Sequence, residues 1–110
     1  MTINSLNIVV PLKNEEKSAK ILIETLKPII KKIEKKTVVT LINDHSSDET
    51  LKILKELEQK FDFIRVYNNE NSTGFGNALK FGINNNKEDA LIIFMGDCSD
   101  NPSDILEYVK

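Results

Sequence analysis

The sequence predicts an α/β fold, a Rossmann-like three-layer sandwich with a mostly parallel sheet of about four strands. Short apolar runs rich in β-branched residues recur along the chain, and each leads through a polar turn into a helical pattern. Such continuous runs are typical of strands buried on both faces. Strands that alternate with helices need crossover connections, which favour parallel pairing. The 110 residues suit one core, so we expect residues 1–110 to form a single domain.

The first unit joins a strand at residues 6–10 to a helix that begins near Asn14. Glu15 and Glu16 fall in the first turn of this helix, where the helix dipole favours acidic side chains. Pro28 should kink the helix or restart it, because proline cannot donate a backbone hydrogen bond. Apolar residues recur at three- and four-residue steps and predict one buried stripe: Ala19, Leu22, Leu26, Ile29, Ile30 and Ile33.

The second strand is predicted at residues 38–42, and a polar turn follows it. Ser46 with Glu49 three residues later has the pattern of a capping box, which indicates the start of a second helix. Leu51, Leu54, Leu57 and Phe61 would give that helix its apolar face. A third, shorter strand is predicted at residues 63–67.

The last part of the chain repeats the theme with a longer loop. Residues 68–76 form an asparagine-rich loop, and residues 77–84 have the pattern of a short helix. A fourth strand is predicted at residues 90–95, followed by a carboxylate-bearing turn at residues 96–101. Pro102 would open a terminal helix, because proline is favoured in the first turn.

Composition and charge exclude several classes of protein. The formal net charge is −2, which argues against a nucleic-acid partner, since such proteins usually carry a basic surface. No stretch approaches the roughly 20 apolar residues that span a bilayer, and the N-terminus does not resemble a signal peptide. The single cysteine, Cys98, cannot form an intramolecular disulfide. We therefore expect a cytoplasmic protein.

Polar and acidic side chains follow the strands, where ligands bind in parallel α/β sheets. Asp97 and Asp100 after the fourth strand form a plausible hard-oxygen site for Mg²⁺ or Mn²⁺. Each has an alternative structural role, because both acids could be turn and cap residues of the following helix. Asp44, after the second strand, could likewise cap the second helix. Gly74 and Gly76 could serve a phosphate loop or only a turn.

Four consecutive blocks resemble the N-terminal blocks of family 2 glycosyltransferases. They read VVPLKNEE, LINDHSSDET, NSTGFGNALKFGI and IIFMGDCSDNPSDI, and together they extend from Ile8 to Ile105. The likeness is nearest to the polyprenyl-phosphate mannosyl- and glucosyltransferases. The resemblance implies the N-terminal, nucleotide-sugar-binding part of a GT-A fold.

The resemblance also implies roles for particular residues. Eight positions match: Pro11, Lys13 and Glu15 would flank the base and ribose, Asp44 would hydrogen-bond the base, Gly74 and Gly76 would lie near the diphosphate, and Asp97 with Asp100 would hold the cation. Two family motifs are altered. The Asp-Asp-Gly-Ser-like turn reads Asn43-Asp44-His45-Ser46, and Met95 replaces the first acid of the metal motif.

The activity implied is binding of a UDP-, GDP- or dTDP-sugar for inverting transfer to an acceptor such as a polyprenyl phosphate or glycan. In the family, the catalytic base and the acceptor surface follow the metal motif. This chain, apparently truncated after that motif, is therefore expected to bind the donor but not to transfer the sugar by itself. Association with a membrane or lipid-linked acceptor, and a homo-oligomer formed through an exposed sheet edge, are further expectations.

Two alternatives remain at this point. One is a catalytically incomplete nucleotide-binding or regulatory module, which the altered metal motif and the early end of the chain favour. The other is a generic doubly wound signalling domain. A signalling receiver needs paired acids after its first strand, whereas Pro11-Leu12-Lys13 stands there.

Overall fold

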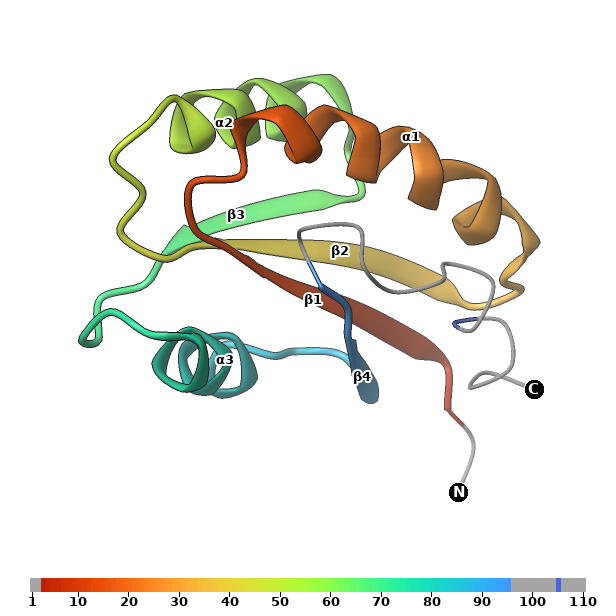
Figure 1. The fold of residues 1–110 in the computed structure, drawn as a ribbon. Coiled ribbons are helices and arrows are strands. Elements are labelled where there is room, and N and C mark those ends of the chain that lie inside the picture. The colour runs from red at the N-terminus through yellow and green to blue at the C-terminus, as the bar shows by residue number, and fades with distance from the viewer. Residues whose placement is uncertain (1–2, 96–104, 106–110) are drawn as a thin grey trace.

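The structure, a computed structural model, describes residues 3–95 and Ile105. Within these residues the chain order is β1 (Ser5–Leu12), α1 (Glu16–Lys32), β2 (Lys36–Asn43), α2 (Thr50–Lys60), β3 (Ile64–Asn68), α3 (Phe75–Asn84) and β4 (Ala90–Ile93). The strands form one parallel sheet in the order β3-β2-β1-β4. Helices α1 and α2 cover one face and α3 covers the other (Figure 1). The predicted three-layer α/β sandwich is confirmed.

The strand register brings the loops of three strands to one edge of the sheet. Leu12 pairs with Asn43 across β1 and β2, and Asn43 pairs with Asn68 across β2 and β3. The ladder continues into the loops, because the Asp44 N–H donates to the Leu12 carbonyl at 2.8 Å. We call this the carboxyl edge of the sheet.

The core lies on both faces of the central strand β1. Ile8 and Val10 pack with the cluster under α1 and α2, whereas Val9 packs with Ile42 and Ala78 under α3. All three β1 side chains are fully buried. A strand covered on both faces has no polar side to present, which explains its continuous apolar sequence.

Two predicted helix starts differ from the structure. The first helix begins at Glu16, because Asn14 adopts a left-handed conformation with φ 54°. The predicted capping box is wrong: α2 begins at Thr50, and the Ser46 hydroxyl accepts a hydrogen bond from the Asn14 N–H at 3.0 Å. Asparagine tolerates left-handed backbone geometry, so a residue that looked like a helix start instead forms a turn.

Smaller differences concern α1, α3 and β4. Pro28 lies inside α1, so the predicted restart at this residue is wrong, while a kink stays a prediction. Helix α3 begins at Phe75, two residues earlier than predicted, because the Gly74 carbonyl already accepts from the Ala78 N–H at 2.9 Å. Strand β4 ends at Ile93, although Phe94 still donates to the Val9 carbonyl at 2.9 Å.

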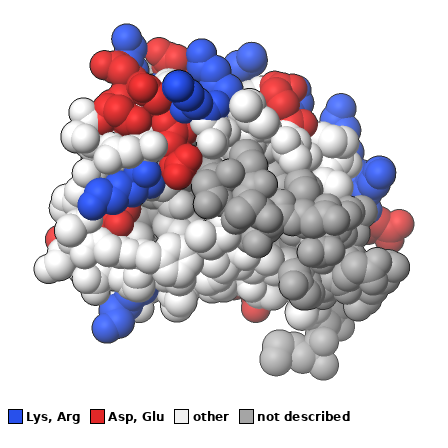
Figure 2. Space-filling view, viewed as in Figure 1, with Lys and Arg blue, Asp and Glu red and all other residues white. Residues whose placement is uncertain are grey.

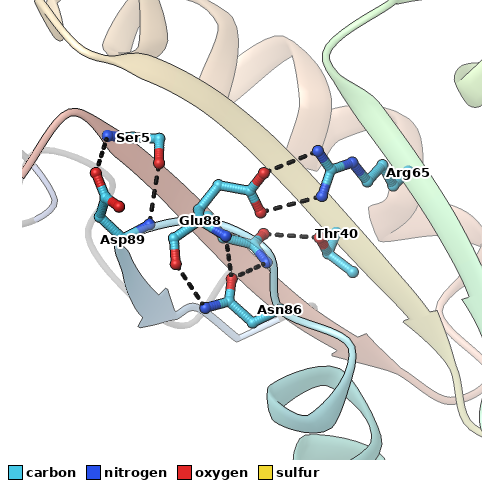
Figure 3. A network of polar contacts seen from close by, with 7 residues as sticks. Ser5, Thr40, Arg65, Asn86, Glu88 and Asp89 are labelled. Atoms are coloured by element: carbon cyan, nitrogen blue, oxygen red, sulfur yellow. Dashed lines mark hydrogen bonds and ion pairs between the residues drawn. The ribbon is translucent and has the colours of Figure 1, made fainter.

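Polar contacts fix the loop between α3 and β4 to the amino ends of the strands (Figure 3). Asp89 accepts from the Ser5 N–H at 3.2 Å, and its own N–H donates to the Ser5 hydroxyl at 2.9 Å. The buried Asn7 amide donates to Asn86 Oδ1 at 3.0 Å and accepts from the Thr40 hydroxyl at 2.7 Å. This network determines where β4 enters the sheet beside β1.

The substitution Gly82→Ala is expected to destabilise the fold. A Cβ at this position would lie 2.9 Å from Cγ1 of Val9, a stiff side chain that is fully buried. Such overpacking costs about 1–3 kcal/mol, and the higher helix propensity of alanine offsets about 1 kcal/mol of it. Urea unfolding measures the difference. Gly76→Ala in the same helix is the control, because a Cβ there meets nothing within 4 Å. Equal effects at the two glycines would contradict the close approach of α3 to the sheet.

Candidate functional site

A cleft of about 200 Å³ opens at the carboxyl edge of the sheet. Its walls come from the end of β1 with the loop after it, the residue after β2, and the start of α3. Six residues line it: Pro11, Leu12, Lys13, Asp44, Gly74 and Phe75. The cleft therefore brings together four of the six residues to which the family resemblance gives a nucleotide-binding role. Leu12 and Phe75 are additional lining residues that sequence reasoning missed.

Asp44 is the buried acid of this cleft. Its side chain is only 4% exposed, and its carboxylate accepts from the Gly74 N–H, at 3.0 Å to Oδ2. The amide of Asn69 donates to Oδ1 at 3.0 Å. The alternative role of Asp44 as a cap of the second helix does not hold, because its carboxylate contacts the N-cap residue of α3 instead. These donors leave part of the acceptor capacity of the carboxylate for a ligand.

Gly74 turns the chain into α3. Its φ of 132° with ψ of 150° is a conformation that essentially only glycine adopts. This geometry aims the Gly74 N–H at Asp44 and places the N-terminus of the ten-residue helix α3 at the cleft. Gly76 is exposed in the first turn of α3 and does not line the cleft.

Lys13 connects the two walls of the cleft. Its Nζ donates to the Thr73 hydroxyl at 3.1 Å. Lys13 lies in the β1–α1 loop, and Thr73 directly precedes Gly74. No carboxylate pairs with this ammonium group in the part of the chain that the structure describes. A cation with a neutral partner keeps its charge available to an anionic ligand.

Glu15 lies beside the cleft and does not line it. It is the N-cap residue of α1, half-buried, and its N–H donates to the Thr50 hydroxyl at 2.9 Å. The same hydroxyl donates to Asp48 Oδ1, which also accepts from the Thr50 N–H at 2.9 Å. The hydroxyl contact is the main reason why the pKa of Asp48 lies below its ordinary value of 3.8, and burial opposes it. These contacts tie the loops after β1 and β2 together.

Two left-handed residues support the same loops. Asn14 Oδ1 accepts from the Ser47 N–H at 2.8 Å. His45, with φ 56°, stands where the resembling family has glycine, and its Nε2 lies 2.9 Å from the Asn71 carbonyl oxygen. Histidine is one of the residues enriched in left-handed geometry, so it can replace that glycine. Asn43, which replaces the first acid, is buried and donates to Asn68 Oδ1 at 3.1 Å.

The predicted metal ligands Asp97 and Asp100 lie outside the described residues, as do the turn at residues 96–101 and Pro102. Strand β4 runs parallel to β1 and ends toward the carboxyl edge. Within residues 3–95 there is no group of three or more histidine, cysteine or acidic side chains that could hold a metal ion. Ile105 is buried in the core under α1 and α2.

A larger hollow of about 410 Å³ lies between α1 and α2, away from the strand ends. It is lined by Lys20, Glu24, Ile53, Glu56, Leu57 and Lys60. Charges of both signs gather over this helical layer (Figure 2). Because no strand end or glycine turn contributes to the hollow, we place the functional site at the smaller cleft. No helix among the described residues has the length and apolar character needed to cross a membrane.

The fold and the family comparison together identify the class of protein. The model of glycosyl transferase family 2 matches residues 7–110, so the chain belongs to that family. This match decides against the generic signalling domain.

Two relatives extend over nearly the whole chain. An undecaprenyl-phosphate 4-deoxy-4-formamido-L-arabinose transferase of Proteus mirabilis is 31% identical, over 97% of this chain and 33% of the relative. An uncharacterised glycosyltransferase of Synechocystis is 33% identical, over 99% of this chain and 34% of the relative. The chain thus spans about a third of the length of these relatives.

Solved glycosyltransferases share the fold. TarS 1-349 of S. aureus in complex with UDP-GlcNAc has a TM-score of 0.72 at 19% identity, over 94% of this chain and 30% of the solved chain. The mannosyltransferase PcManGT of Pyrobaculum calidifontis in complex with GDP-Man and Mn²⁺ has a TM-score of 0.70 at 15% identity, over 84% of this chain and 27% of that one. At these identities the likeness concerns the fold.

Proposed function

We propose that this chain is the donor-binding domain of a family 2 glycosyltransferase and that the cleft at the carboxyl edge holds a nucleotide-diphospho-sugar. The observation that carries the proposal is the buried Asp44 carboxylate in a cleft also lined by Lys13 and Gly74. A buried acid, a cation and a helix N-terminus are the groups needed for a ligand that has both a nucleobase and a diphosphate. TarS and PcManGT were solved with such ligands, which supports this reading.

The chemistry of Asp44 selects among nucleobases. A carboxylate accepts hydrogen bonds, so it suits the ring N–H of uracil, thymine or guanine. Adenine and cytosine present an unprotonated ring nitrogen at the corresponding place, and an acceptor facing an acceptor is unfavourable. Phe75, which is 47% exposed in the same cleft, offers an apolar surface that a flat base can cover. The proposal therefore favours UDP-, dTDP- and GDP-sugars over ADP- and CDP-sugars, whose bases offer the carboxylate only an exocyclic amino group.

A divalent cation completes the proposal. Asp97 and Asp100 would hold Mg²⁺ or Mn²⁺, because both ions prefer carboxylate oxygens. When bound, the ion would supply Lewis-acid stabilisation of the diphosphate leaving group. Among the described acids, Asp44 is already held by two N–H donors, so it is better suited to base recognition than to metal binding.

The acceptor and the remaining chemistry belong to a longer enzyme in this proposal. The chain spans 33% of the Proteus mirabilis transferase, whose name specifies an undecaprenyl-phosphate acceptor. We assign residues 1–110 to one donor domain and expect an inverting transfer to a polyprenyl phosphate or glycan. We further propose that the domain works in the cytoplasm, at the membrane face that carries the lipid-linked acceptor. Among the described residues, β3 and β4 are the outer strands of the sheet, and a homo-oligomer would assemble through such an edge.

Calorimetric titration tests the proposal. UDP-, GDP- and dTDP-sugars are titrated into the chain with and without Mn²⁺, and at least one is expected to bind, more tightly with the ion. ADP- and CDP-sugars serve as controls and are expected to bind more weakly. Absence of binding by all three candidates at millimolar concentration would overturn the donor-site proposal. Asp97→Ala should abolish the effect of Mn²⁺ on affinity while leaving metal-free binding unchanged. If Mn²⁺ still tightened binding, the cation would have to bind at other residues.

A further inference from the structure

The loop after β3 is held by one buried side chain, Asn69, which is 4% exposed. Its amide nitrogen donates to Asp44 Oδ1 at 3.0 Å and to the Ser72 carbonyl at 3.2 Å. Its amide oxygen accepts from the Asn71 N–H at 2.9 Å. The side chain thus uses both ends of its amide inside the protein, between the acid of the cleft and the loop that leads to Gly74.

These partners determine the orientation of the amide. If it were turned over, its oxygen would face the Asp44 carboxylate and its NH₂ group would face the Asn71 N–H. Both contacts would be repulsive, and the one with Asp44 is buried, which costs more than a missing hydrogen bond. Asn69 therefore presents a donor to Asp44 at all times, and aspartate cannot take its place without loss of that donor.

We propose that Asn69 is a positioning residue for nucleotide binding, which rests on the proposed donor site. It acts through Asp44 and the loop rather than by touching the ligand. Asn69 and the Gly74 N–H hold the carboxylate from two sides. The same loop carries Thr73, the partner of Lys13 across the cleft. The orientation of the acid and the width of the cleft are consequently coupled through one amide.

The substitution Asn69→Asp tests this role, because it keeps the size and removes the donor. Two carboxylates would then face each other at hydrogen-bond distance and repel while both are ionised. We expect UDP, GDP or dTDP, whichever binds the unmodified chain most tightly, to bind about ten-fold more weakly at about pH 8. At about pH 5.5 one proton shared between the carboxylates restores the bridge, so much of the affinity returns.

Other charged groups near Asp44 are common to both proteins. Lys13 from the β1–α1 loop, the neighbouring His45 and Glu70 from the loop after β3 are unchanged in the variant. The pH profile of the unmodified chain therefore records their contribution. Asn84→Asp is the matched control, since it adds the same charge at the exposed end of α3. Its profile should follow that of the unmodified chain.

Asn69→Ala is a second, independent test of the positioning role. It removes the donor without adding charge, so binding should weaken at every pH with no recovery in acid. Circular dichroism at each pH shows that the variants are folded. A folded Asn69→Asp with the pH profile of the unmodified chain, or Asn69→Ala with undiminished affinity, would overturn the positioning role. Failure of the unmodified chain to bind any of the three nucleotides would instead overturn the donor site itself, and this inference with it.

Discussion

Asp44→Ala is expected to weaken nucleotide binding about ten- to hundred-fold. The substitution removes the hydrogen-bond acceptor proposed for the nucleobase. It also releases Gly74, because the Asp44 carboxylate accepts from the Gly74 N–H at 3.0 Å. A hydrogen bond to a charged group contributes about 1.5–3 kcal/mol, so loss of the base contact lowers the affinity about ten- to hundred-fold. Calorimetric titration with the tightest-binding nucleotide measures it.

The stability of this variant has to be measured alongside its affinity. Asp44→Ala leaves the buried Asn69 amide nitrogen without its carboxylate partner, which costs about 1–3 kcal/mol. The titrations should therefore be carried out at a temperature well below the midpoint of thermal unfolding of the variant. Asp62→Ala is the control, because Asp62 is exposed ahead of β3 and far in sequence from every cleft residue. Binding by Asp44→Ala as tight as that of the control would show that the base is recognised elsewhere.

The layered fold could be predicted because its signals are local. Each strand is a short apolar run, and each helix has its own periodic stripe, as β1 and α1 illustrate. The helix starts were less predictable. Ser46 and Glu49 match a capping pattern in sequence, but in space Ser46 contacts Asn14 of the β1–α1 loop and Glu49 contacts Glu16 of α1. A short-range pattern cannot reveal that its polar atoms have partners about thirty residues away.

The cleft was predictable in part because its residues follow predicted strands. Residues after parallel strands meet at one edge whatever the strand order, which is why Lys13, Asp44 and Gly74 could be grouped. Phe75 was missed because its place in α3 depends on the conformation of Gly74. Asn69 was missed because it stands in an asparagine-rich loop, where nothing in the sequence marks the one amide that is buried.

A second large loss of stability is expected at Glu88, on the α3–β4 loop. Its carboxylate binds Arg65 of β3 through two hydrogen bonds, at 3.0 and 2.8 Å (Figure 3). The Glu88 side chain is 6% exposed and that of Arg65 is 30% exposed. Glu88→Ala is expected to lower the free energy of unfolding by about 2 kcal/mol, because it leaves a partly buried guanidinium unpaired. Urea unfolding measures this change.

Two controls separate the ion pair from its surroundings. Glu24→Gln breaks the pair that the exposed Glu24 forms with the half-buried Lys27 at 3.8 Å and should cost at most about 0.5 kcal/mol. The double variant Arg65→Met with Glu88→Leu should recover most of the loss, since apolar side chains of similar size can replace a buried pair. If the double variant were no more stable than Glu88→Ala, the ion pair itself would be required for the stability of the fold. The bridge lies toward the amino ends of the strands, so metal-free nucleotide affinity should stay unchanged in all three variants.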